Sequence, residues 1–283
     1  IDGAVDEERN APALAALVQR VVATTSGRAR PVRVLPASLR VHDLGFSQRR
    51  NGASVPLGLD ETTFTTAELD FDGLDRNLLI IGDSGTGRTG ILIHIAQTMA
   101  DGAHPDDVVI AVIDPRGAMR GVVSNDILGG YAGSTVMAGR LVEAMVPELE
   151  LRATRLADAA ASSIAPTPRI VLIVDDYDVL TASGSSPLAP LVPYLSMGRE
   201  VNLNVVVARR TNGAARGMFE SAFASVREAG ATGLLLSGDR SEGQLFGSVR
   251  PALLPTGRGQ LVRAGQRPRT VQTVHAEIGA RSP

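Results

Sequence analysis

The sequence predicts an α/β fold in which a mostly parallel central sheet is covered by helices on both faces. Short apolar runs recur along the chain, beginning with residues 78–81, 108–113 and 170–174, and strands buried on both faces of a parallel sheet have this composition. Helical stretches separate the runs, and such strand–helix alternation is typical of doubly wound sheets. A glycine-rich segment, residues 82–87, joins the first run to a helix expected from Arg88.

The N-terminal segment, residues 1–30, is expected to form a helical arm, followed by one large domain over residues 31–283. Four apolar residues fall at helical spacing on one face: Leu14, Leu17, Val18 and Val21. Asn10, with Pro12 just behind it, marks the expected helix start. Two interpretations stay open for this arm. It is either a helix packed on the domain or a linker helix from a preceding domain.

The remaining elements follow from the same patterns. Short extended pieces are expected at residues 32–36, 55–59 and 62–71, with a turn at 49–52. Further strands are expected at residues 203–208, 233–236, 259–263 and 270–275. A long helix is expected from about Ser134 to Ala161, with a kink or break at Pro147, because proline removes a helical hydrogen bond. A shorter helix is expected at residues 221–229.

The loop after residues 78–81 matches the phosphate-binding (Walker A) pattern GxxxxGK[ST], except that arginine stands in place of lysine. Its glycines permit turns that aim backbone N–H groups at phosphates, and the start of the following helix adds positive partial charge. The planar guanidinium of Arg88 is not interchangeable with the compact charge of lysine, so we expect weakened catalysis rather than abolished binding. The predicted nucleotide-binding residues of this loop are Gly82, Asp83, Ser84, Gly85, Thr86, Gly87, Arg88, Thr89 and Gly90.

A pair of carboxylates follows the strand expected at residues 170–174. Asp175 stands where such a strand ends in an aspartate that holds Mg²⁺, and Thr89 is the second expected Mg²⁺ ligand. The additional strand at 108–113, between loop and carboxylates, indicates the RecA-like branch of P-loop ATPases. In that branch a glutamate usually activates the attacking water. Asp176 stands there and is one methylene shorter, so it is a weak candidate base, since a misplacement of about 1 Å can cost ~10²-fold in rate.

Arginines follow two other strands. Arg116 ends the segment Asp114-Pro115-Arg116 after the second strand, where a plain turn and a functional segment are equally open. Arg209 and Arg210 follow the strand at 203–208, where a polar residue can sense the terminal phosphate. We expect Arg209 to contribute to nucleotide binding, while an intersubunit contact or a solvated position stays open for both arginines.

The composition limits the classes of ligand. All 28 basic residues are arginine, so the exchange at position 88 can reflect drift as well as function. A net charge of −2 and a pI near 6.1 give no indication of nucleic-acid binding. The chain has no cysteine, and its four histidines show no metal-ligand spacing. No apolar run approaches the ~20 residues that cross a bilayer, so we expect no membrane insertion of this segment.

Together these motifs resemble the FtsK/SpoIIIE ATPases and, more closely, the EccC family of type VII secretion ATPases. Asp114-Pro115-Arg116 is similar to the DPK segment of the FtsK/SpoIIIE ATPases. Five ordered segments resemble the last ATPase domain of EccC: residues 34–36, 55–61, 213–216, 234–243 and 254–259. The resemblance covers nearly everything from about residue 30 onward.

The resemblance implies a domain that binds ATP or ADP with Mg²⁺, hydrolyses ATP weakly or not at all, and docks Esx-type export substrates through their C-terminal signal. It also implies that the arm at 1–30 follows a preceding ATPase domain of the same chain. The location implied is cytoplasmic, tethered to an inner-membrane secretion complex. Two alternatives stay open. One is a working ATPase motor in which Arg88 replaces lysine, and the other, less favoured, is a DNA translocase.

Overall fold

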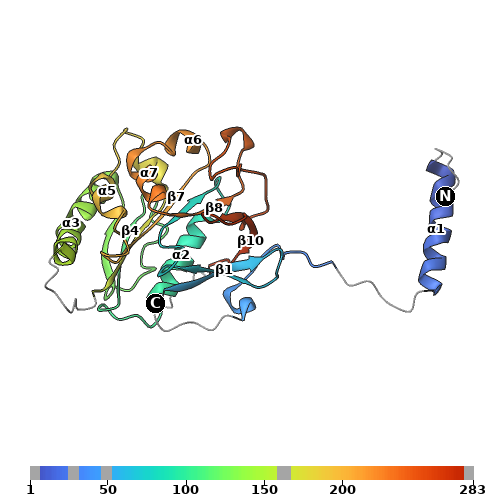
Figure 1. Ribbon diagram of the computed structural model, residues 1–283, viewed down its shortest axis with the longest axis horizontal. Helices are drawn as coiled ribbons and strands as arrows, with labels where there is room; N and C mark the ends of the chain where they lie inside the picture. The colour runs from blue at the N-terminus through green and yellow to red at the C-terminus, as the bar shows by residue number, and fades with distance from the viewer. Residues whose placement is uncertain (1–6, 25–31, 46–52, 158–166, 277–283) are drawn as a thin grey trace. The chain divides into compact units, whose positions relative to one another are not determined.

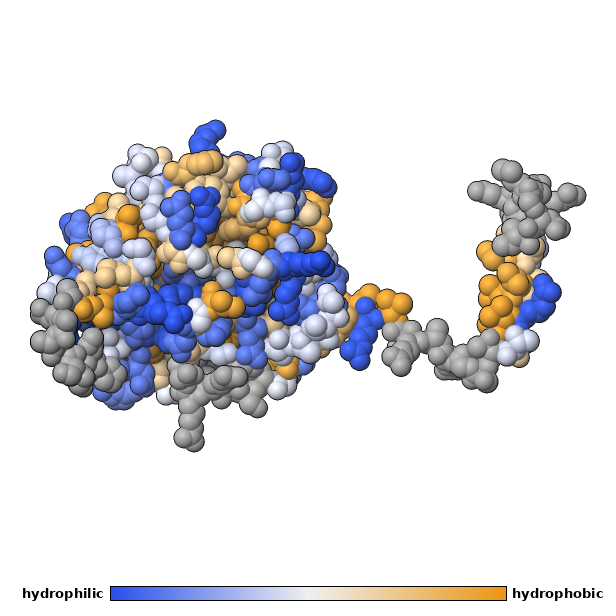
Figure 2. Space-filling model, viewed as in Figure 1, coloured by the Kyte–Doolittle hydropathy of each residue, from blue (hydrophilic) through white to orange (hydrophobic). Residues whose placement is uncertain are grey.

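The computed structural model describes residues 7–24, 32–45, 53–157 and 167–276, and the chain forms two compact units, Ile1–Val34 and Leu35–Pro283. The first unit holds helix α1 (Glu7–Thr24), drawn in blue in Figure 1. This helix begins before Asn10, the expected start, and Pro12 lies inside it. Its four apolar residues at helical spacing are exposed, and Figure 2 shows hydrophobic residues gathered along α1.

The second unit is built on one ten-stranded sheet with the order β2-β1-β10-β9-β8-β3-β7-β6-β4-β5. Six strands form its parallel part: β3 (Leu78–Ile81), β4 (Val108–Ile113), β5 (Leu128–Ala132), β6 (Arg169–Val174), β7 (Leu203–Arg209) and β8 (Thr232–Leu236). Four strands extend it in antiparallel pairs: β1 (Ser54–Asp60), β2 (Thr66–Asp70), β9 (Arg258–Val262) and β10 (Arg269–Thr273). The predicted mostly parallel α/β fold is confirmed.

Helices cover both faces of the sheet (Figure 1). The longer ones are α2 (Arg88–Ala100), α3 (Thr135–Ala157) and α7 (Ser221–Glu228), and the short ones are α4 (Tyr177–Leu180), α5 (Val192–Leu195), α6 (Ala214–Gly217), η1 (Val41–Leu44), η2 (Ala189–Leu191) and η3 (Arg240–Glu242). Alternate residues of β3 enter two separate cores: Leu79 and Ile81 pack with α3 and α7, and Leu78 and Ile80 pack with α2. This alternation is the period of two that a strand imposes, and it explains why β3 is apolar throughout.

The helix predicted from Ser134 passes Pro147 without interruption, so of the expected kink or break the break was wrong and the kink stays a prediction. Pro147 is exposed, whereas Val142 and Leu149 are fully buried against the sheet. Burial of these side chains offsets the cost of an interior proline, about 3 kcal/mol. The last expected residues of this helix, 158–161, lie outside the described residues, as does the turn expected at 49–52.

Strand β5 at the sheet edge was not predicted, and residues 32–36 form no strand in their described part. β5 contains Gly129 and Gly130, which weaken a strand signal. A Cβ atom on Gly129 would lie 2.5 Å from the Val109 side chain, and one on Gly130 would lie 2.4 Å from Leu141. A larger residue at either position would push the Val109 or Leu141 side chain aside. β4 and α3 therefore pack closely against glycines that weaken the sequence signal of this strand.

Helix α2 carries a buried histidine that makes stability depend on pH. His94 is 3% exposed, its Nε2 lies 2.7 Å from the Pro56 carbonyl oxygen, and burial lowers the pKa of His94. The unfolded chain, with a histidine pKa of about 6.5, therefore binds a proton that the folded chain does not, so stability falls as pH drops below about 6.5. The loss is at most about 1.4 kcal/mol per pH unit.

Thermal unfolding between pH 7.5 and 5.5 checks this prediction. The melting temperature of the native sequence is expected to fall more steeply than that of His94→Gln, whose amide can donate to the Pro56 carbonyl without titrating. Parallel curves for the two proteins would contradict it.

Among the residues that the structure describes, no helix combines the length and apolarity needed to span a bilayer.

Candidate functional site

The phosphate-binding pattern forms a loop at the carboxyl end of β3, between strands β8 and β7. Gly85 has φ 77° and Gly87, which precedes α2, has φ 109°, values that only glycine adopts without strain. The loop is tied to both neighbouring strands: Gly82 N–H donates to the Arg209 carbonyl at 3.3 Å, and Asp83 N–H donates to the Ser237 carbonyl at 2.8 Å. The loop is thus anchored to the centre of the sheet.

Thr89 and Asp175, the two predicted Mg²⁺ ligands, lie together. The Thr89 hydroxyl donates to Asp175 Oδ2 at 2.6 Å, and Asp175 is 1% exposed. Burial raises the pKa of Asp175, while hydrogen bonds from Thr89 and from the Asp176 backbone oppose the rise. A hydroxyl and a carboxylate side by side are hard oxygen donors of the kind that Mg²⁺ takes. The pair therefore fits the predicted ion.

Within the described parts of the chain, no group of three or more acidic, histidine or cysteine side chains is placed to hold a metal ion. Mg²⁺ usually keeps several waters and binds proteins through one or two side chains together with substrate phosphates. Thr89 and Asp175 would accordingly be the only protein ligands among the described residues, with the remaining positions taken by phosphate and water.

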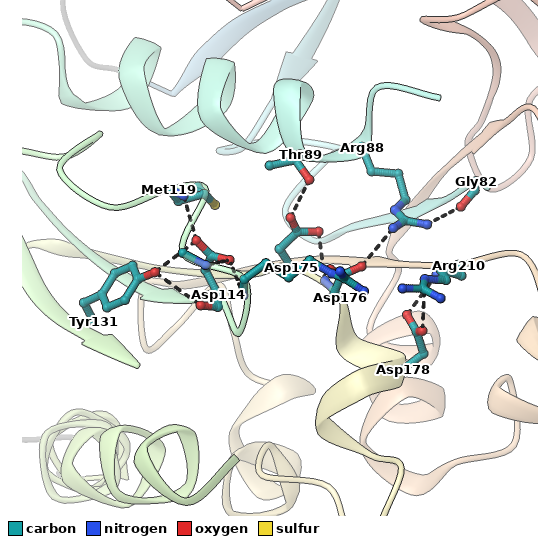
Figure 3. A network of polar contacts seen from close by, with 12 residues as sticks. Gly82, Arg88, Thr89, Asp114, Met119, Tyr131, Asp175, Asp176, Asp178 and Arg210 are labelled. Atoms are coloured by element: carbon teal, nitrogen blue, oxygen red, sulfur yellow. Dashed lines mark hydrogen bonds and ion pairs between the residues drawn. The ribbon is translucent and has the colours of Figure 1, made fainter. Parts of the chain in front are cut away.

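Arg88 folds back across its own loop (Figure 3). Its Nη1 donates to the Gly82 carbonyl, and its Nη2 donates to Asp176 Oδ1 at 2.9 Å. The side chain is 8% exposed. Its Nε is buried and has no hydrogen-bond partner among the described residues. The residue that replaces the pattern's lysine therefore links the start of the loop to the end of β6.

Asp176 holds two guanidinium groups at once. Its Oδ1 accepts from Arg88, and its Oδ2 accepts from Nε of Arg116, while the carboxylate side chain is 4% exposed. The backbone of Asp176 is left-handed, with φ 44°, a conformation that costs a residue with a Cβ of order 1–3 kcal/mol and is common at functional sites. Each oxygen of Asp176 thus already accepts a hydrogen bond from a guanidinium group.

A buried aspartate shapes the turn that carries Arg116. Asp114 is fully buried and accepts hydrogen bonds from four donors: the backbone N–H groups of Arg116 at 3.0 Å, Gly117 at 2.9 Å and Met119 at 2.6 Å, and the Tyr131 hydroxyl at 3.0 Å. Burial, aided by Asp114, raises the pKa of Tyr131 to about 12. The turn after β4 is therefore held in one geometry, which Figure 3 shows next to Asp175 and Asp176.

Arg209 directs its side chain away from the phosphate loop. Its Nη2 donates to the Gly213 carbonyl at 3.1 Å, and its guanidinium lies 5.5 Å from the centre of the Phe223 ring. Burial lowers the pKa of Arg209. Nε of its neighbour Arg210 lies 3.7 Å from Oδ2 of Asp178. The described contacts thus place Arg209 at α6 and α7, and its role in nucleotide binding stays a prediction.

A cavity of about 320 Å³ opens beside the loop. The loop and the start of α2 form one part of its wall, and the rest comes from Ile93, Ala118, Thr256, His275 and Ala276. Sequence patterns missed these five residues. The backbone shows how the last three arrive: Gly257 N–H donates to the Thr86 carbonyl at 3.0 Å, and the Gly257 carbonyl accepts from Thr273 N–H at 2.7 Å. Only the order of the strands brings the C-terminal segment to the phosphate loop.

Comparison with known proteins identifies relatives. No protein-family model matches the chain. It is 35% identical over 239 residues to the ESX-4 secretion system protein EccC4 of Mycobacterium tuberculosis, covering 83% of this chain and 19% of that protein. It is 31% identical over 285 residues to the ESX secretion system protein EccC of Thermomonospora curvata, covering 98% of this chain and 21% of that protein. The chain thus spans about a fifth of the length of these curated relatives.

Solved structures agree with the sequence matches. The T. curvata EccC structure of ATPases 2 and 3 in complex with a signal sequence peptide superposes with a TM-score of 0.82 at 29% identity, covering 98% of this chain and 50% of that one. The cytoplasmic domain of the same type VII secretion ATPase gives a TM-score of 0.81 at 29% identity, covering 98% and 32%. These likenesses confirm the predicted P-loop ATPase fold of FtsK type. The chain therefore belongs to the EccC family of ESX, or type VII, secretion ATPases.

Proposed function

We propose that this domain binds ATP or ADP with Mg²⁺ and hydrolyses ATP slowly or not at all. The observation that carries the proposal is the 2.9 Å ion pair between Arg88 and Asp176, since both stand at positions where an active ATPase needs a free lysine and a free glutamate. Each is engaged by the other, whereas Gly85 and Gly87 have positive φ angles, which allow a turn to aim backbone N–H groups at an anion.

The nucleotide is proposed to act as a structural or regulatory ligand, because a ligand stabilises the conformation that binds it. The phosphate loop touches both parts of the sheet: it bonds to β7 through the Arg209 carbonyl and to the segment before β9 through Gly257 N–H. A phosphate group bound to this loop would therefore brace the parallel part of the sheet against its antiparallel extension.

The domain is further proposed to dock Esx-type export substrates through a C-terminal signal. Support comes from the T. curvata relative, which was solved in complex with a signal sequence peptide. In this proposal the domain follows another ATPase domain of the same chain and works on the cytoplasmic side of a membrane secretion complex. Fluorescence anisotropy with a labelled signal peptide tests the docking. Peptide affinity indistinguishable from that of a scrambled peptide would remove this part and leave nucleotide binding untouched.

Arg88→Lys tests the slow turnover. We expect less than about a tenfold gain in the rate of ATP hydrolysis, because Asp176 stays short by one methylene and stays bound to Arg116, and misplacement of about 1 Å can cost ~10²-fold. Single-turnover hydrolysis at saturating ATP measures this rate. A gain of a hundredfold would identify arginine as the limiting defect of a working motor. Turnover of the native domain at about 1 s⁻¹ or faster, within the ordinary enzyme range, would also contradict the proposal.

Ala118→Phe tests the cavity as the nucleotide site. Ala118 lines the cavity and is exposed, so an aromatic ring there fills the space without disturbing the core. We expect ATP affinity to fall by roughly tenfold, equivalent to about 1.4 kcal/mol, at an unchanged melting temperature. The matched control is Ala144→Phe, at an exposed position of α3, which should bind ATP like the native domain. Equal ATP affinity in both variants would place the nucleotide elsewhere.

A further inference from the structure

Arg116 stands out among the charged residues at the carboxyl edge of the sheet. Strands β4 and β6 pair in parallel with Ile113 opposite Val174, so the segments that follow them leave the sheet side by side. Arg116 reaches across this pair to Asp176, as Arg88 does from the phosphate loop. One carboxylate thus accepts from two guanidinium groups, one at the start of α2 and one in the turn after β4.

The two arginines differ in their freedom to leave Asp176. The Arg88 side chain is 8% exposed and also holds the Gly82 carbonyl. The Arg116 side chain is 56% exposed, and its only described hydrogen bond is the one to Asp176. Departure of the Arg116 guanidinium would therefore break the ion pair with Asp176 and no other described side-chain hydrogen bond of Arg116.

The backbone of Arg116, in contrast, is fixed at the edge of the site. Asp114 holds the N–H groups of Arg116, Gly117 and Met119, and Ala118 of the same turn lines the cavity beside the phosphate loop. Arginine binds phosphate oxygens through two parallel hydrogen bonds. A fixed backbone with an exposed, always charged head group next to a phosphate loop is suited to bind an anion that arrives there.

We propose that Arg116 binds the triphosphate of a nucleotide in addition to the phosphate loop. Asp176 holds the Arg116 guanidinium until the terminal phosphate of a nucleoside triphosphate replaces the carboxylate. The inference rests on the proposed nucleotide binding and adds the residue that distinguishes ATP from ADP. The position of Arg116 supports the terminal phosphate as its ligand. Its partner Asp176 directly follows Asp175, which with Thr89 marks the Mg²⁺ side of the loop.

The test compares ATP, ADP and inorganic tripolyphosphate, each with Mg²⁺, by calorimetric titration of the whole chain. Arg116→Gln is expected to weaken ATP and tripolyphosphate binding about tenfold and to leave ADP within about twofold, since one charge-assisted bidentate contact is lost. The matched control is Arg120→Gln, because Arg120 lies in the same turn and packs over the Tyr131 ring at 5.1 Å instead of on Asp176. It should bind all three ligands like the native chain.

Asp176→Asn gives a second readout of the same inference. The amide keeps the shape of the carboxylate without its charge. It therefore competes less with phosphate for the guanidinium groups of Arg88 and Arg116, and ATP affinity is expected to rise at least threefold. A residue with a merely structural role would not raise it. The inference is overturned if Arg116→Gln binds ATP like the native chain, if it loses ADP and ATP equally, or if Asp176→Asn weakens ATP binding. If the native chain bound neither ATP nor tripolyphosphate, the proposed function itself would fall as well.

Discussion

Replacing Arg263 with methionine is expected to lower the free energy of unfolding by about 3–5 kcal/mol, because it leaves a buried charge without its partner. Arg263 donates two hydrogen bonds of 2.7 Å to the Asp75 carboxylate, from Nε and Nη2. The Asp75 side chain is 1% exposed and that of Arg263 is 13% exposed, so water screens the pair little. Thr232 and the Asp70 backbone donate to the same carboxylate at 2.6 and 2.8 Å.

The location of this pair explains the size of the effect. Asp75 precedes β3, Thr232 opens β8, and Arg263 follows β9. Their contacts join the parallel part of the sheet to its antiparallel extension. Since a domain of this kind is stable by only about 5–15 kcal/mol, a loss of several kcal/mol would be visible as a large shift in the urea midpoint.

Urea unfolding of three variants measures this loss in the free energy of unfolding. Arg267→Met, at an exposed arginine four residues further on, should stay within about 0.5 kcal/mol of the native chain. The double variant Asp75→Asn with Arg263→Met should recover part of the loss, because the unpaired charge is then gone. If Arg263→Met unfolds at the same urea concentration as Arg267→Met, the ion pair does not contribute to stability.

The second large effect is expected from Gly82→Ala, which should reduce ATP affinity by tenfold or more, at least about 1.4 kcal/mol. A Cβ atom on Gly82 would lie 2.6 Å from the Thr86 hydroxyl oxygen and 2.7 Å from Leu236 Cβ. Leu236 belongs to the fully buried end of β8 and has no room to move. The phosphate loop would have to shift, and its backbone N–H groups would then no longer point toward a bound phosphate.

The chain contains its own control for this experiment. Gly139 lies in α3, outside the residues that line the cavity, and a Cβ atom there would meet nothing within 4 Å. Gly139→Ala should therefore keep the native ATP affinity and stabilise the helix slightly, by roughly 0.5–1 kcal/mol. ATP affinities that fall together in the two variants would show that the loop does not require a bare Gly82.

Several elements were predictable because their cause lies within a few consecutive residues. Strand β3 begins and ends where expected, at Leu78 and Ile81, since burial on both faces requires four apolar residues in a row. Helix α2 begins at Arg88 as expected, and two glycines of the loop before it, Gly85 and Gly87, stand at positive φ angles. Such signals are local, and a sequence displays them directly.

Other features depend on partners that the sequence does not place side by side. Pro147 stays inside α3 because buried neighbours hold the helix to the sheet, and the glycines of β5 lie closely against side chains of β4 and α3. Thr256 and His275 reach the cavity only through the order of the strands. None of these outcomes follows from the pattern of the segment itself.

The sequence by itself determined the prediction of a nucleotide site, since one short loop holds the phosphate-binding pattern and its exchange of lysine for arginine. The tertiary structure decided what that exchange means. Arg88 meets Asp176 across 88 residues, and Arg116 meets it across 60. Charge pairing depends on distance in space, which the order of β3, β6 and β4 in the sheet sets and the order of residues in the chain does not.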